Sequence, residues 1–288
     1  MSADAPDPPD PAHTASADGE AVPAAPAVSL AGTVIAVTGG GSGIGEALCR
    51  HLAAQRPAAV AVVDVDGDAA AATAERIAPL GAAYTADLGV ESEVVGTIAR
   101  ITNDLGPIDL WCGNAGVLAI GGVDVPTEAW QQTWDVNVMA HVWAARQLIP
   151  AMIARGGGRF LFTASAAGLL TQIGSAPYSV SKHAAVALAE WLSITHGDDG
   201  IAVTLLCPQA VATAMTAGID GGGVAGVDGM LSADAVAAAA VAGVLAGDDY
   251  VLPHPEVATY AQRRAADPTR WLAGMRRLQA RFAGGRAP

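Results

Sequence analysis

Short apolar runs alternate with longer segments of helical pattern from residue 33 onward. The runs are rich in β-branched residues and hold few polar positions, which is typical of strands covered on both faces of a parallel sheet. Clear strands are predicted at 34–38, 60–64, 108–112, 159–163 and 201–206, and helices between them at 44–55, 68–77, 91–105, 128–154 and 178–196.

Repeated strand–helix–strand units predict an α/β fold, a Rossmann-like doubly wound parallel sheet with helices on both faces. An α/β barrel is the alternative, and it needs eight strand–helix units. The chain offers about seven strands, so the open sheet is favoured.

The chain divides into three parts by composition. Residues 1–28 hold many prolines and acids and no Lys or Arg, which predicts a disordered leader and not a secretory signal. Residues 29–253 form the predicted catalytic domain, within which the glycine-rich stretch 213–231 is expected to be an active-site lid. Residues 254–288 form an Arg-rich helical extension, expected to pack on the domain or on a neighbouring subunit, with a nucleic-acid arm as the alternative.

Composition excludes several classes of protein. A net charge of −13 argues against nucleic acid as the main partner. The longest apolar stretch, 235–247, is too short to span a bilayer. The three cysteines, Cys49, Cys112 and Cys207, show no metal-ligand spacing, and their odd number favours reduced thiols and a cytoplasmic protein. The scattered histidines likewise predict no metal site.

A glycine-rich turn lies between the first predicted strand and the first helix. Gly39 allows a tight turn, Gly43 allows backbone N–H groups to approach a pyrophosphate, and Gly45 allows helix and strand to pack closely. The helix that begins near Ile44 adds a dipole that favours an anion. The spacing G-x-x-x-G-x-G differs from the more familiar G-x-G-x-x-G, and an ordinary glycine turn is the alternative to a dinucleotide site.

Asp64 strengthens the interpretation of the glycine-rich turn as part of a dinucleotide-binding site. It ends the second predicted strand, where a carboxylate can accept both hydroxyls of an adenosine ribose and repel a 2′-phosphate. The neighbouring Ser42 and Val65 offer no compensating positive charge. The cofactor is therefore predicted to be NAD.

Tyr178 and Lys182 are four residues apart on a predicted helix and can lie side by side. A nearby cation lowers the pKa of a phenol, which suits Tyr178 to proton transfer near neutral pH. Lys182 is the only lysine in a chain that otherwise uses arginine, so chance is a poor explanation for this spacing. Ser165 follows the predicted strand 159–163, at the sheet edge where ligands bind in such folds.

In order and spacing, these residues resemble the short-chain dehydrogenase/reductase family in its compact, NAD-preferring form. The likeness runs from about residue 33 to 251 and also includes the segment 114–116, Asn137 and the segment 208–213. Two positions depart from the family pattern. Gly113 replaces the first Asn of Asn-Asn-Ala-Gly, and Gln209 replaces the Gly of a Pro-Gly turn.

The resemblance implies a role for each matching residue. Tyr178 is the expected general acid/base, Ser165 orients the reacting oxygen, Lys182 holds the nicotinamide ribose, and Asn137 holds a water in a proton relay. Cofactor contacts are expected from Gly39, Ser42, Gly43, Ile44, Gly45, Asp64, Asp87, Leu88, Asn114, Ala115, Gly116, Tyr178, Lys182, Pro208, Val211 and Thr213. The substrate is expected at Ser165, Tyr178, Val117, Leu169, Gln172 and Met215, with Leu118 and Pro177 nearby.

The predicted function is NAD-dependent interconversion of a secondary alcohol and a ketone, with a hydrophobic small molecule as substrate because the expected pocket is mostly apolar. Two alternatives stay open: a nucleotide-sugar epimerase or dehydratase, and a sensor or scaffold that binds NAD without turnover. The resemblance also implies a homotetramer, with the helices at 128–154 and 178–196 in an interface.

Overall fold

The computed structural model describes residues 28–218 and 220–283. The predicted leader, residues 1–28, lies outside the described residues except for Val28. The N–H of Val28 donates to the carbonyl oxygen of Leu245 at 3.0 Å, and Val28 packs partly buried against the core.

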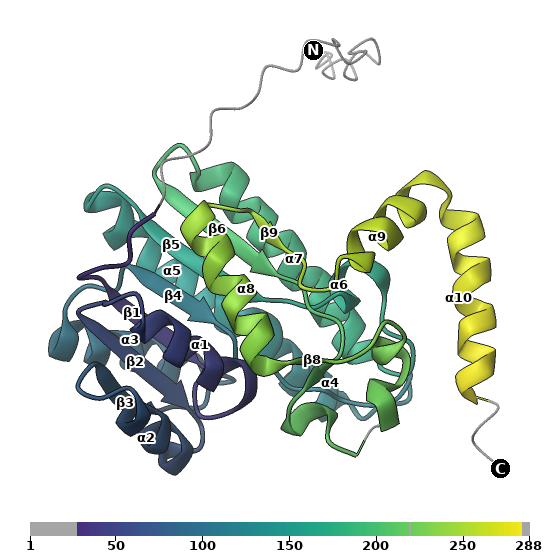
Figure 1. The fold of residues 1–288 in the computed structure, drawn as a ribbon, viewed down its shortest axis with the longest axis horizontal. Coiled ribbons are helices and arrows are strands. Elements are labelled where there is room, and N and C mark those ends of the chain that lie inside the picture. Colours follow the sequence, from purple (N-terminus) through teal and green to yellow (C-terminus); the bar gives the residue numbers. More distant parts are fainter. Residues whose placement is uncertain (1–27, 219, 284–288) are drawn as a thin grey trace, which may run out of the picture.

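A parallel sheet of seven strands forms the centre of the fold, as predicted (Figure 1). Its order is β3-β2-β1-β4-β5-β6-β9. The strands are β1 (Val34–Thr38), β2 (Ala59–Asp64), β3 (Gly81–Thr85), β4 (Leu110–Gly113), β5 (Gly158–Thr163), β6 (Ile201–Leu206) and β9 (Tyr250–Val251). The order reverses between β1 and β4, and in open α/β sheets ligands bind in the crevice outside the carboxyl ends of the strands at such a point.

Helices cover both faces of this sheet. One buried apolar cluster joins the sheet to α1 (Gly43–Ala53), α2 (Gly67–Arg76) and α8 (Ala233–Ala246). A second joins the opposite face to α3 (Glu91–Leu105), α5 (Ala140–Ala154) and α7 (Ala176–His196). The sheet is thus buried on both sides, which explains why its strands read as apolar runs and not as alternating patterns.

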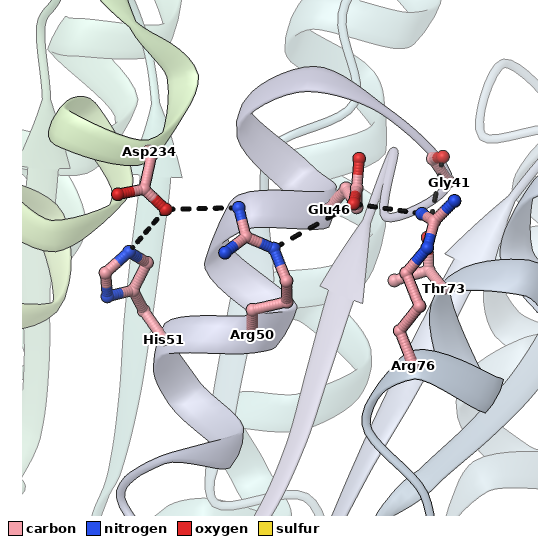
Figure 2. Close-up of polar contacts among 7 residues, drawn as sticks. All are labelled: Gly41, Glu46, Arg50, His51, Thr73, Arg76 and Asp234. Carbon is pink, nitrogen blue, oxygen red and sulfur yellow. Dashed lines mark hydrogen bonds and ion pairs between the residues drawn. The ribbon is translucent and has the colours of Figure 1, made fainter.

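Polar contacts link three helices on one face (Figure 2). Arg50 and His51 of α1 both reach Asp234 of α8, with N···O distances of 3.1 and 3.0 Å. Glu46 of α1 accepts from Arg76 of α2 at 2.9 Å. These pairs are largely exposed, so they add little to the stability that the apolar cluster supplies beneath them.

The predicted helix 128–154 is interrupted. It consists of α4 (Thr127–Trp134), a π-helical turn η1 (Asp135–Met139) and α5, and the turn holds the buried Asn137. Single π turns of this kind are frequent at functional sites.

The predicted lid, 213–231, contains two short 3-10 segments, η2 (Ala214–Thr216) and η3 (Asp220–Gly226). It is closed off by pairing of β7 (Val211–Ala212) with β8 (Leu231–Ser232). A short helix, α6 (Ala167–Leu170), follows β5.

The chain ends in two helices, α9 (Glu256–Ala266) and α10 (Pro268–Ala283). Trp271 anchors α10 against a small cluster around Leu170 and Val257, while the rest of α10 extends away from the sheet (Figure 1). Among the described helices, none combines the length and apolar character needed to cross a membrane.

Candidate active site

Two adjoining cavities open at the carboxyl edge of the sheet. The inner cavity, about 460 Å³, is lined by residues that follow β1, β2, β4, β5 and β6 together with Tyr178 and Lys182 of α7. The outer cavity, about 1050 Å³, lies between α6, the segment 224–228 and the helices α9 and α10. Ser165, Gln172, Gln209 and Ala225 line both, so these four residues mark the junction.

The glycine-rich turn forms one wall of the inner cavity. Gly39 and Gly43 have φ angles of +62° and +54°, a region that favours glycine. A Cβ on Gly45 would lie 1.9 Å from the carbonyl oxygen of Gly39, so this residue permits helix and strand to pack and does not itself line the cavity. The turn leads directly into α1, whose amino end can receive a phosphate group.

Asp64 lies beside this turn, at the end of β2, and also lines the inner cavity. Its carboxylate accepts from the backbone N–H of Gly41 at 2.9 Å and from that of Asp66 at 3.0 Å. These two bonds fix the carboxylate and leave lone pairs for further donors such as ribose hydroxyls. This polar geometry fits the adenosine end of a dinucleotide.

Asn114 fastens three strands together beneath the cavity. Its Nδ2 donates to the carbonyl oxygen of Thr38 at 3.1 Å, and its Oδ1 accepts from the Thr163 hydroxyl at 3.0 Å. The Thr38 hydroxyl in turn accepts from the backbone N–H of Asn114 and of Ala115. The two threonines were not predicted as site residues. They end apolar runs, and the sequence does not reveal that both hydroxyls bind Asn114.

Tyr178 lines the inner cavity beside Ser165, which lines both cavities. The Ser165 hydroxyl donates to the carbonyl oxygen of Pro208 at 3.3 Å and accepts from the N–H of Ala167 at 3.1 Å. Burial raises the pKa of Tyr178, while the nearby Ser165 hydroxyl acts in the opposite direction. In the protein without cofactor, the pKa of Tyr178 is therefore raised and not lowered as expected, because burial disfavours the phenolate more than the neighbouring groups favour it.

Lys182 lies beneath Tyr178. Its Nζ is 5.6 Å from the centre of the Tyr178 ring and donates to the carbonyl oxygen of Thr163 at 2.9 Å. Burial lowers the pKa of Lys182 to about 8. The ammonium group has two further hydrogens to donate, and it faces the inner cavity.

Asn137 is fully buried in the π-helical turn. Its Oδ1 accepts from the N–H of Val117 at 2.9 Å, and its Nδ2 donates to the Val117 carbonyl and to the Ser181 hydroxyl, both at 3.0 Å. The side chain thus braces the loop after β4 against α7. The relay water stays a prediction from the resemblance.

The first departure from the family pattern has a packing reason. A Cβ on Gly113 would lie 2.6 Å from Nδ1 of His141 and 2.8 Å from the Phe162 ring. The His141 and Phe162 ring centres are 4.5 Å apart, and both side chains are buried. Two rings therefore occupy the space that a side chain at position 113 would need.

The second departure creates new contacts. The Gln209 side chain donates through Nε2 to Asp228 at 3.1 Å, and the backbone N–H of Gln209 donates to Nδ1 of His254 at 3.2 Å. Asp228 also accepts from the Tyr260 hydroxyl of α9 at 2.9 Å. The turn after β6, the predicted lid and α9 are thereby joined, a link that the sequence did not reveal.

The inner cavity collects most of the predicted cofactor residues. It is lined by Gly39, Ser42, Gly43, Ile44, Asp64, Asp87, Leu88, Asn114, Ala115, Gly116, Tyr178, Lys182, Pro208, Val211 and Thr213. Of the residues predicted for the substrate, Val117, Leu118, Gln172 and Met215 line it too. Leu169 and Pro177 line neither cavity; Leu169 packs against the core, and its carbonyl oxygen accepts from Arg264.

Within residues 28–218 and 220–283, no group of three or more His, Cys, Asp and Glu side chains is arranged to hold a metal ion. The lining of the inner cavity fits a nicotinamide dinucleotide, with a glycine turn, a helix amino end, a carboxylate that can accept from ribose hydroxyls and a buried ammonium group.

Comparisons with known proteins agree with this geometry. The family model for short chain dehydrogenase matches residues 33–221. The 1-deoxy-11-beta-hydroxypentalenate dehydrogenase of Streptomyces exfoliatus is 41% identical over 209 residues, covering 70% of this chain and 75% of its own. Epidermal retinol dehydrogenase 2 of Mus musculus is 32% identical over 202 residues, covering 67% of this chain and 65% of its own.

Solved structures show the same fold. A short-chain dehydrogenase/reductase from Burkholderia phymatum in complex with NAD has a TM-score of 0.77 and 27% identity, covering 83% of this chain and 95% of its own. A 3-ketoacyl-(acyl-carrier-protein) reductase from Brucella melitensis complexed with NADH has a TM-score of 0.72 and 26% identity, covering 78% and 97%.

The fold and the site define an oxidoreductase that uses a nicotinamide cofactor. The chain belongs to the short-chain dehydrogenase/reductase family, and it acts on a CH–OH group or the corresponding carbonyl.

Proposed function

We propose that this enzyme interconverts a secondary alcohol and a ketone with NAD, using Tyr178 as the general acid/base. The proposal rests on one observation. Ser165, Tyr178 and Lys182 line the same cavity as Asp64 and the glycine turn. A protein that only bound the cofactor would not need a phenol and a serine hydroxyl at the point where the two cavities join.

The chain's own residues bind, orient and move a proton. Ser165 accepts from a backbone N–H, and its hydroxyl is free to turn from the Pro208 carbonyl to the substrate oxygen. The Tyr178 Oη takes the alcohol proton in oxidation or gives it to the ketone oxygen in reduction. Lys182, held by the Thr163 carbonyl, stabilises the phenolate and donates to the ribose. When bound in the inner cavity, a nicotinamide cofactor would supply or take up the hydride.

Asp64 supports NAD over NADP. Its position at the end of β2, with both oxygens held by backbone N–H groups, directs a fixed negative charge into the adenosine end of the inner cavity. A 2′-phosphate there would meet a carboxylate, and neither Ser42 nor Val65 supplies a positive charge to offset the repulsion.

Tyr178→Phe tests the reaction. Removing the phenol hydroxyl is expected to reduce turnover of a panel of cyclic secondary alcohols with NAD⁺ at least about a hundredfold, since general acid/base catalysis contributes that much or more. NADH binding, followed by fluorescence titration, should change little. Turnover retained in this variant would refute the role of Tyr178, and NADH binding by the wild type without turnover of any alcohol would favour the sensor.

Asp64→Ala tests the choice of cofactor. Without the carboxylate, the ratio of kcat/KM for NAD⁺ over NADP⁺ should fall about tenfold, equivalent to about 1.4 kcal/mol. An unchanged ratio would show that Asp64 does not discriminate between the two cofactors.

The substrate is a hydrophobic, cyclic alcohol or ketone. The printed names of the relatives, a hydroxypentalenate dehydrogenase and a retinol dehydrogenase, support this class. The segment 213–231 acts as the lid, because Thr213 already lies against Gly43 across the inner cavity. The catalytic domain is 29–253, and the described part of the extension, residues 254–283, packs on that domain through Val257 and Trp271.

The enzyme is a cytoplasmic homotetramer. The three cysteines are free and buried, which supports a reducing compartment. Large apolar side chains are exposed on α4 and α7, namely Trp134, Val180, Trp191 and Ile194, and these support subunit contacts through the same helices.

A further inference from the structure

The outer cavity has a charged wall that the reaction described above does not use. Its floor is Ser165, where the reacting oxygen is held, and its far wall is made by α9 and α10. Both helices lie beyond residue 221, the last that the family model matches.

Four arginines line this wall: Arg263 of α9 and Arg270, Arg277 and Arg281 of α10. The three on α10 are spaced at i, i+7 and i+11, which places them on one face of the helix. The opposite side of α10, with Leu272, Arg276 and Phe282, faces a different cavity. The side of α10 that carries Arg270, Arg277 and Arg281 is thus turned toward the active site.

These charges are not neutralised by the protein. Among the described residues, no carboxylate lies within 4.0 Å of the side-chain nitrogens of Arg263, Arg270, Arg277 or Arg281. The cavity contains two aspartates, and both are engaged elsewhere. Asp228 accepts from Gln209 and Tyr260, and Asp267 accepts from the backbone N–H of Arg270.

Arg264 provides the contrast within the same segment. It is partly buried, and its guanidinium donates to the carbonyl oxygen of Leu169 and contacts Nε2 of His183. That is an arginine with a structural role. The four cavity arginines are exposed. Arg263 lies over the Tyr260 ring at 5.9 Å, while Arg277 and Arg281 are four residues apart on one face of α10, where like charges repel slightly.

Much of the remaining lining is apolar. Leu170, Val224, Val227, Trp271 and Leu278 line the cavity together with Ser165 and the arginines, beside the polar Thr171, Gln172 and Gln209. In a chain whose net charge is −13, four arginines against two aspartates gather around an apolar chamber that ends at the reacting oxygen. A ligand that complements both the apolar lining and the arginines has an apolar skeleton, with a negative charge at the end away from the reacting oxygen.

We infer that the substrate is an organic anion, a hydrophobic cyclic alcohol or ketone that bears a carboxylate, and that Arg270, Arg277 and Arg281 with Arg263 bind the carboxylate. This inference rests on the proposed function, since it assigns the reacting end to Ser165 and Tyr178. The arginines bind and orient the substrate. They hold its carboxylate, and the Ser165 hydroxyl holds its reacting oxygen, so the reacting carbon is fixed at the junction of the cavities.

The test uses a rigid pair of probes, 1-adamantanecarboxylate and the uncharged 1-adamantanecarboxamide, titrated calorimetrically into the full chain saturated with NAD⁺. The carboxylate is expected to bind about tenfold more tightly than the amide, and this advantage should shrink as salt is raised from about 0.05 to 0.5 M. Arg270→Gln/Arg277→Gln should abolish the advantage, while amide binding stays the same.

Arg276→Gln is the matched control, because Arg276 is on the same helix but faces the other cavity. It should leave the preference for the carboxylate unchanged. Three outcomes would each overturn the inference. The wild type could bind acid and amide equally, or it could fail to bind the acid at about 1 mM. The double variant and Arg276→Gln could also lose the preference for the acid to the same extent.

The first step of the experiment separates this inference from the proposed function. Binding of NAD⁺ and oxidation of uncharged cyclic alcohols depend on Tyr178 and not on the arginines. If the wild type binds NAD⁺ and oxidises uncharged cyclic alcohols but binds the acid and the amide equally, the substrate class is wrong and the reaction stands. If NAD⁺ does not bind to the wild type, the proposed function itself fails.

Discussion

His141 is buried beside the active site with no hydrogen-bond partner for its Nε2 among the described residues. Burial, together with the nearby Lys182 charge, lowers its pKa to about 3. The ring is therefore neutral in the folded protein across the physiological range.

This burial predicts a loss of stability in acid. As the pH falls below about 6.5, the unfolded chain takes up a proton at residue 141 and the folded chain does not, so stability from this group is lost progressively toward pH 3. Between pH 7 and pH 5 the wild type should lose about 2 kcal/mol more than His141→Leu, measured by urea denaturation. Parallel pH curves for the two proteins would contradict the assignment.

The packing of Gly113 against the His141 ring predicts a second effect on stability. Gly113→Ala places a methyl group 2.6 Å from the His141 ring, so we expect a loss of about 1–3 kcal/mol of unfolding free energy. Gly96→Ala is the control, because the added methyl meets nothing within 4 Å in α3, and it should be neutral or stabilising by about 0.5–1 kcal/mol. Equal effects in urea denaturation would rule out the packing explanation.

Most residues of the inner cavity could be predicted from sequence, because each follows a strand whose carboxyl end meets the same edge of the sheet. The contact of Gln209 with Asp228, and those of Asn114 with Thr38 and Thr163, could not. These contacts join positions 19, 76 and 49 residues apart, and nothing in the local pattern records which side chains converge.

At the scale of elements, the link from Gln209 through Asp228 to Tyr260 holds the segment 213–231 to α9. Asp228→Ala removes both hydrogen bonds, and Tyr260→Phe removes one. A hydrogen bond to a charged group contributes about 1.5–3 kcal/mol, and less where it is exposed.

Amide hydrogen exchange in the segment 213–231 should therefore be about tenfold faster in Asp228→Ala than in the wild type, and intermediate in Tyr260→Phe. Asp198→Ala, in the turn before β6, serves as the control and should exchange at the wild-type rate in that segment. Unchanged exchange in Asp228→Ala would mean that the segment is held by other contacts.

The elements that sequence reasoning did not place are the ones with the weakest patterns. β3 is rich in Gly and Ala, and β9 has two residues, so neither shows an apolar run. The break at residues 135–139 keeps helical periodicity on both sides, which is why the segment 128–154 was predicted as one helix. The interruption arises from tertiary contacts of Asn137 with the loop after β4.

At the scale of the whole molecule, exposed apolar side chains on α7 predict assembly. Ile194 is 85% exposed, and an Asp there would place a charge in the proposed interface. Ile194→Asp should shift the molecular mass measured by light scattering from a tetramer to a smaller species. Val123→Asp, at a side chain that is 90% exposed outside α4 and α7, should leave the mass unchanged. A tetramer that persists in Ile194→Asp would move the interface elsewhere.

Lys182 offers a site for selective chemical modification. It is the only lysine in the chain, and burial brings its pKa to about 8, so part of the population is an uncharged amine at mildly alkaline pH. Acylating reagents that target amines have only this side chain and the terminal amine to modify. Covalent tagging at position 182 should thus report directly whether the active site is occupied, with coenzyme shielding the nitrogen from the label.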